Sequence, residues 1–163
     1  MAKFFRAFDW TLNAILSLLM AGMVVVIAAQ VWYRFVINNP LDWSEEAGRY
    51  MFVWISFLGA AAGVRYRVHL GIDLLEKLVP PTAYRYLILL MNLLVAIFLV
   101  VVIYQGIQII KVVRFQTSAS MGISMTWPYL AVPVGAALML INAVRVTWEV
   151  FCEHKSRSEE VGP

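Results

Sequence analysis

Histidine and cysteine are almost absent from this chain, which has two histidines and one cysteine among its 163 residues. His69 and His154 fall in a polar segment and a polar tail, so they do not provide the facing imidazoles that a haem-binding helical bundle needs. The lone Cys152 excludes an intramolecular disulfide, a cysteine metal cluster and the disulfide exchange of a thiol oxidase. We therefore expect no metal and no cofactor.

Charge is also scarce: 14% of the residues are charged and 62% are hydrophobic, whereas soluble domains have roughly 25% charged residues. Three charge-free runs each exceed the about 18 residues that indicate a membrane-spanning helix. A shorter apolar run, 51–64, is lengthened by a helix-compatible segment before it. We predict an all-α integral membrane protein with four transmembrane helices, at about 10–35, 44–65, 84–111 and 126–149. These form one domain over 1–153, followed by a polar cytoplasmic tail over 154–163.

Most lysines and arginines lie near the N-terminus, in the middle loop and near the C-terminus, and fewer lie in the other two loops. By the positive-inside rule, both termini are predicted to be cytoplasmic, in a multi-pass membrane protein. Tryptophans and tyrosines, Trp127 among them, lie near the expected span ends, as an interfacial aromatic belt requires.

Carboxylates are missing from the middle of every expected span, although a small drug/proton antiporter would need one there. No basic run is interleaved with aromatic residues, so the basic pI of about 9.2 reflects the uneven loop charge and not a nucleic-acid surface. No residues suited to catalysis are brought together by the pattern. We expect neither an enzyme nor a nucleic-acid partner, and membrane lipids as surroundings.

One face of the second span carries an ion pair followed by small residues. On a helical wheel, one arc of about 100° holds Glu45, Arg49, Phe52, Ser56, Gly59, Ala60 and Gly63. The opposite side holds the bulky Tyr50, Trp54, Phe57 and Leu58, which we expect to suit lipid. Small residues allow close helix packing in a membrane. Two interpretations remain open: the whole arc packs on the chain's own spans, or the small residues do so while the charged end faces another subunit.

Further candidates lie at the two ends of the second span. Glu46 points about 100° away from Glu45 and is either a solvated carboxylate or an acceptor for a cation of a docking protein. At the other end come Arg65, Arg67, His69 and Asp73. They act either as a snorkelling positive-inside anchor or as a grip on a neighbouring subunit's loop or an anionic lipid headgroup.

Several blocks resemble the small permease subunit (DctQ-type) of TRAP transporters, the tripartite ATP-independent importers of organic acids. In order, they are Arg34-Phe35; PLDWSEE at 40–46; Arg49; FVW at 52–54; FLGAA at 57–61; RYRVHLGID at 65–73; QTS at 116–118; and MTWPYLAVPVG at 125–135. The likeness spans residue 29 to about 142. One departure is Ala119, which stands where the family pattern has proline.

The resemblance implies a division of labour between three proteins. A periplasmic substrate-binding protein captures the substrate, and a large permease subunit moves it by symport with sodium or protons. The small subunit would then be a scaffold and docking partner, with Glu45, Glu46, Arg49, Ser56, Gly59, Gly63, Arg65, His69, Asp73 and Trp127 as candidate contact residues. C4-dicarboxylates are the first expected substrates, followed by sialic acid or other sugar acids. The alternatives are an autonomous homodimeric transporter and an assembly or anchor subunit of another membrane complex.

Overall fold

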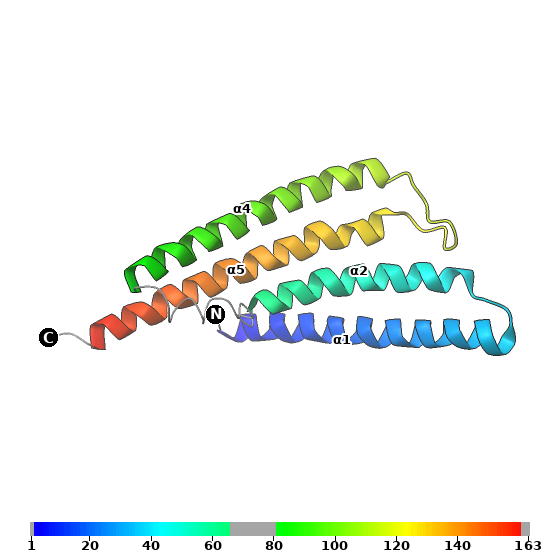
Figure 1. The fold of residues 1–163 in the computed structure, drawn as a ribbon, viewed down its shortest axis with the longest axis horizontal. Coiled ribbons are helices and arrows are strands. Elements are labelled where there is room, and N and C mark those ends of the chain that lie inside the picture. The colour runs from blue at the N-terminus through cyan, green and yellow to red at the C-terminus, as the bar shows by residue number, and fades with distance from the viewer. Residues whose placement is uncertain (1, 66–80, 161–163) are drawn as a thin grey trace.

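The computed structural model describes residues 2–65 and 81–160. These residues form four long α-helices and one short π-helix (Figure 1). The elements are α1 (Ala2–Trp32), η1 (Tyr33–Ile37), α2 (Asp42–Arg65), α4 (Pro81–Val113) and α5 (Thr126–Glu160). Each α-helix contains a stretch long and apolar enough to cross a membrane: Arg6–Ile37, Asp42–Val64, Leu89–Val113 and Thr126–Arg145. The prediction of four long apolar helices is therefore confirmed, and each is a candidate membrane span.

Local sequence explains where the helices begin and end. Asn38 adopts the left-handed conformation with φ 56°, which asparagine tolerates better than most residues, and its N–H donates to the carbonyl of Tyr33. Ser44 Oγ donates to the carbonyl oxygen of Leu41 at 2.6 Å and so secures the turn that opens α2. Pro81 begins α4, where its missing N–H costs no helical hydrogen bond.

The helices lie side by side in one layer, in the order α1, α2, α5, α4, with α2 and α5 running parallel and the outer pairs α1–α2 and α5–α4 antiparallel (Figure 1). The α1–α2 connection and the segment between α4 and α5 lie together at what we call the loop end, residues 33–45 and 111–128. The chain termini lie at the opposite end, here called the termini end. Because the layer is open, among the described residues α1 packs mainly along α2, and α4 packs along α5.

The interior of the layer follows α2 and α5. Leu12, Leu58 and Ala62 form a buried cluster, against which Leu16, Leu19, Trp54 and Leu138 pack. Glycines set the helix spacing: a Cβ built on Gly135 would lie 2.5 Å from Phe57 Cβ, and one built on Gly106 would lie 3.0 Å from Pro133 Cδ. By contrast, many large apolar side chains of α1 and α4 are exposed. Those surfaces need lipid or another protein to cover them.

Candidate docking site at the loop end

Glu46, in the first turns of α2, holds the loop between α4 and α5. Its Oε2 accepts hydrogen bonds from Ser118 Oγ at 2.7 Å, Met121 N at 3.1 Å and Ser120 N at 3.2 Å. Its Oε1 accepts one from Ala119 N at 3.1 Å. Successive backbone N–H groups thus converge on one carboxylate, a nest that suits an anion. The two sequence-based interpretations, a solvated carboxylate or an acceptor for a partner's cation, both missed this internal role.

The loop itself is a small, ordered hairpin. Ser118 N donates to the carbonyl of Ile123 at 2.8 Å, and Met125 N donates to that of Gln116 at 2.9 Å. Gly122 turns the chain with φ 65°, a conformation that favours glycine. Ala119 supplies an N–H to Glu46 that a proline at this position would lack. Hydrogen bonds within the loop therefore fix its shape, and Glu46 of α2 holds the loop in place.

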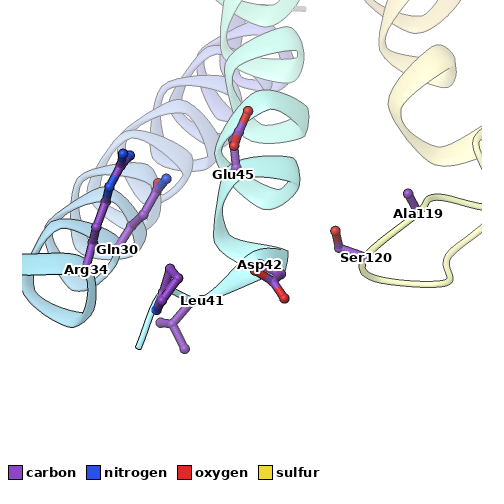
Figure 2. Close-up of a pocket in the computed structure, with 8 residues that line it drawn as sticks. Gln30, Arg34, Leu41, Asp42, Glu45, Ala119 and Ser120 are labelled. Carbon is purple, nitrogen blue, oxygen red and sulfur yellow. The ribbon is translucent and has the colours of Figure 1, made fainter. Parts of the chain in front are cut away.

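A polar groove of about 670 Å³ opens beside this loop. Figure 2 shows Gln30 and Arg34 side by side on the first helical segment, Asp42 at the start of α2 and Ser120 on the facing loop. Pro40, Leu41, Glu45 and Ala119 complete its lining. Both signs of charge therefore border one hollow at the loop end. Such a groove can receive polar side chains from another protein's surface.

Glu45 and Arg49 form the ion pair that their i,i+4 spacing indicates. Arg49 Nη2 lies 3.0 Å from Glu45 Oε1, and the two side chains are 65% and 71% exposed, respectively. The same face continues with Phe52, which is 61% exposed, and with Ser56, whose Oγ donates to the Phe52 carbonyl at 2.8 Å. The pair therefore begins an exposed stripe that runs along α2.

Packing of the small residues against the chain's own spans, an element of both interpretations of the stripe, is wrong for the described structure. A Cβ built on Gly59 or on Gly63 would meet no atom of the described residues within 4 Å, and Ala60 is exposed. We call Glu45, Arg49, Phe52, Ser56, Gly59, Ala60 and Gly63 the α2 stripe. It faces away from the other helices that the structure describes.

The expectation that the bulky side of α2 faces lipid is wrong too. Leu58 is 5% exposed and belongs to the core cluster, where Trp54 packs against it. Phe57 lies over Gly135 of α5, whose missing side chain leaves room for the ring. Large side chains on α2 thus meet small ones on α5, and this complementarity decides which face turns inward. The signal in the sequence was the Gly135-Ala136-Ala137 run on α5.

The structure describes only some of the remaining candidate contact residues. Trp127 begins α5 at the loop end and is 65% exposed, as an interfacial tryptophan would be. Arg65 is the last residue of α2. Arg67, His69 and Asp73 lie outside the described residues. Within the described ranges, no group of three or more His, Cys, Asp or Glu side chains could hold a metal ion.

Two polar contacts inside the layer were not anticipated from the sequence. Arg145 Nη1 lies 3.2 Å from Asp9 Oδ2 and joins α5 to α1. Nearer the middle of the layer, Asn142 Nδ2 donates to the carbonyl of Ala61 at 2.7 Å. The two residues of each pair are far apart in sequence, so no local spacing predicts the contact.

Comparison with known proteins agrees with this architecture. The model of the family "Tripartite ATP-independent periplasmic transporters, DctQ component" matches residues 23–153. The sialic acid TRAP transporter small permease protein SiaQ of Vibrio cholerae is 29% identical over 76% of this chain and 72% of its own length. The C4-dicarboxylate TRAP transporter small permease protein DctQ of Rhodobacter capsulatus is 31% identical, over 74% of this chain and 54% of its own.

A longer relative matches as well. The sialic acid TRAP transporter permease protein SiaT of Haemophilus influenzae is 31% identical over 88% of this chain, which spans only 23% of that protein. These relatives are transporter permease proteins and not enzymes. With four apolar helices in the structure and the family model covering most of their length, the chain belongs to the DctQ family of TRAP transporter small permeases.

Proposed function

We propose that this chain is the scaffold and docking subunit of a TRAP transporter in the bacterial inner membrane, with both termini in the cytoplasm. It pairs with a large permease subunit that carries the substrate, and it helps to receive a periplasmic substrate-binding protein. The observation that carries this proposal is the α2 stripe, an ion pair and small residues left uncovered on a membrane helix.

The small residues of the stripe favour a protein neighbour over lipid. In a bilayer, helix association depends on close van der Waals packing, and glycine and alanine allow two backbones to approach closely. Within the described chain, Gly59 and Gly63 have open space where a side chain would be. A helix of another subunit laid along this stripe would fill that space. The stripe is therefore the proposed contact with the large permease.

The charged end of the stripe supports the same contact. Charged groups near a membrane usually face partners or water and seldom face lipid tails. Glu45 and Arg49 are more than half exposed, although their helix is apolar further along. A polar rim on the large subunit would cover them without leaving either charge unpaired.

Longer relatives support a large partner beside these helices. This chain matches 23% of the SiaT permease and 22% of the isethionate TRAP transporter permease protein DctMQ of Oleidesulfovibrio alaskensis, which is 25% identical. In those proteins, the region similar to this chain and a much larger remainder belong to one polypeptide. We infer that the partner here is a separate chain corresponding to that remainder.

The groove at the loop end is the proposed contact for the substrate-binding protein. It is hollow, polar and bordered by Arg34, Asp42 and Glu45, so it can pair with side chains of either charge. Electrostatic contacts of this kind mainly set the rate and specificity of encounter. The hairpin held by Glu46 forms one of its walls and fixes its shape.

Carriage of the substrate falls to the large subunit. The charged side chains of the described helices lie toward the ends of the apolar spans, and a transport path for an anion needs polar or charged groups at membrane depth. Relatives are named for sialic acid, C4-dicarboxylate and isethionate, all organic anions. We propose an organic acid substrate, moved by a sodium or proton gradient.

Co-purification from mild detergent tests the assembly. The tagged chain is expressed with its native operon, and the retained proteins are identified by mass spectrometry. We expect one large, many-span permease in fixed ratio, and we expect Gly59→Leu or Gly63→Leu to lose it. Val101→Leu, at an exposed position of α4, is the matched control and should retain it. Recovery of this chain alone as a homodimer would instead support an autonomous transporter.

A further inference from the structure

The two edge helices of the layer finish with the same dipeptide. Arg34-Phe35 lies in η1, which continues α1, and Arg114-Phe115 directly follows α4. Each guanidinium lies over the ring of its neighbour, with the central carbon 5.7 Å from the Phe35 centroid and 4.4 Å from the Phe115 centroid. The rings themselves are 71% and 81% exposed. Both edges thus present a cation and an aromatic ring at the loop end.

The α4 edge carries a second cation. Lys111 lies three residues before Arg114, so the two side chains project from neighbouring positions of the last turn, and both residues are exposed. Among the described residues, neither forms an ion pair, whereas Arg49 is paired with Glu45. The nearby carboxylate of Glu46 already accepts four hydrogen bonds from the hairpin. The two cations therefore lack an anion within the described chain.

The position of Lys111 and Arg114 at the end of the apolar span indicates which kind of anion they would meet. The apolar span of α4 ends at Val113, so Lys111 and Arg114 lie where hydrocarbon gives way to lipid headgroups. Arginine binds phosphate oxygens through its planar fork, and long cationic side chains reach toward the headgroup level. We propose that Lys111 and Arg114 bind the phosphate of an anionic phospholipid headgroup, with Phe115 seated in the interface beside it.

The apolar surroundings favour a lipid over an acidic protein surface. Val112 is 72% exposed and Phe115 is 81% exposed, on the same short segment as the two cations. A lipid satisfies both needs at once, because its phosphate meets the cations and its acyl chains meet the apolar side chains. Arg34-Phe35 repeats the arrangement on the α1 edge. The inference requires membrane insertion of the chain but not the assembly proposed above.

Native mass spectrometry of the full chain, titrated with phosphatidylglycerol or phosphatidylcholine, tests the site. Each cation near a lipid headgroup is worth about 1 kcal/mol, so Lys111→Gln with Arg114→Gln should weaken phosphatidylglycerol binding roughly thirtyfold. Phosphatidylcholine binding should change much less. Arg49→Gln, which removes a paired cation from the same end, is the matched control and should leave phosphatidylglycerol affinity unchanged.

Two further readouts separate the possible failures. Lys111→Arg keeps the charge and should keep phosphatidylglycerol binding. That result would tie the loss of binding in the double variant to the removed charge. Unchanged phosphatidylglycerol affinity in a folded double variant would overturn the proposal. It would also be overturned if that variant kept its lipid but lost the co-expressed large permease, because the cations would then contact protein.

Discussion

Ser118 donates a 2.7 Å hydrogen bond to Glu46, although 71 residues separate the two along the chain. The bond ties the start of α2 to the hairpin between α4 and α5. Three backbone N–H groups of the same hairpin converge on the same carboxylate. One side chain therefore fixes the shape of a loop that borders the groove, and the loop end is built as a unit.

Glu46→Gln should loosen the hairpin without unfolding the layer. The amide keeps one acceptor oxygen but replaces the other with an NH2 group, which faces backbone donors. We expect faster hydrogen exchange at the amides of residues 119–121, with α5 little affected. Glu45→Gln, one residue away and outside the nest, is the control and should leave those amides protected. Equal protection in Glu46→Gln and the parent chain would contradict the proposed role of the carboxylate.

Two glycines on different faces of the layer should respond differently to substitution by alanine. Gly135→Ala places a Cβ against Phe57 and must push α5 from α2, so we expect a loss of about 1–3 kcal/mol in unfolding free energy. Gly63→Ala meets open space within the described chain and should leave the stability of the isolated chain unchanged. Thermal unfolding in detergent measures both. A destabilising Gly63→Ala would show that the stripe is packed internally after all.

Glu45 and Arg49 should matter to uptake more than to the stability of the chain. An exposed pair of this spacing contributes only about 0.3–0.5 kcal/mol, so either single charge reversal should leave the isolated chain folded. We expect each to reduce uptake in vesicles containing the whole transporter, because the pair lies on the proposed contact with the large permease. The charge-swapped double variant should recover part of the activity. No recovery would argue against a direct role of the pair.

The sequence predicted where the helices lie along the chain better than it predicted which helices pack against each other. Charge-poor apolar runs mark the four candidate spans because burying a charge in hydrocarbon is costly, and that cost depends on local composition alone. The order α1, α2, α5, α4 depends on which faces complement each other. The Gly59–Gly63 pattern indicated a packing face, but a pattern on one helix does not say whether its partner is in the same chain. The partner of Phe57 was a glycine 78 residues away.

In the candidate site too, the contacts set by local spacing were predicted, whereas those set by the fold were missed. Glu45 and Arg49 were found because their interaction is local and follows from helical spacing. Glu46 was noticed as a separate direction on the wheel, yet its donors are mainly backbone N–H groups, which every residue but proline has. Only the folded hairpin turns them toward one point. Spacing in sequence contains no signal for such a nest.

Asp9 and Arg145 should be strongly coupled. Their side chains are only 8% and 17% exposed, so the pair is largely shielded from water, and removing one charge weakens the contact between α1 and α5. Arg145→Gln should therefore lower the unfolding free energy by about 1–3 kcal/mol. Adding Asp9→Asn should cost much less than its effect alone, and a double-mutant cycle measures this. Additive effects would show that the two side chains act independently.

Asn142 should contribute little, despite being 1% exposed. Its Nδ2 bonds to the carbonyl of Ala61, but its Oδ1 is buried without a hydrogen-bond partner among the described residues. Hydrogen bonds between membrane helices average about 0.6 kcal/mol, and an unsatisfied acceptor offsets such a gain. Asn142→Leu, which keeps the branched shape and the number of heavy atoms, should change the unfolding free energy by less than about 1 kcal/mol, whereas Asn142→Ala also opens a cavity and should cost more. A large loss in the leucine variant would mean that Oδ1 is satisfied in the assembled transporter or by bound water, and that the amide holds α2 and α5 together.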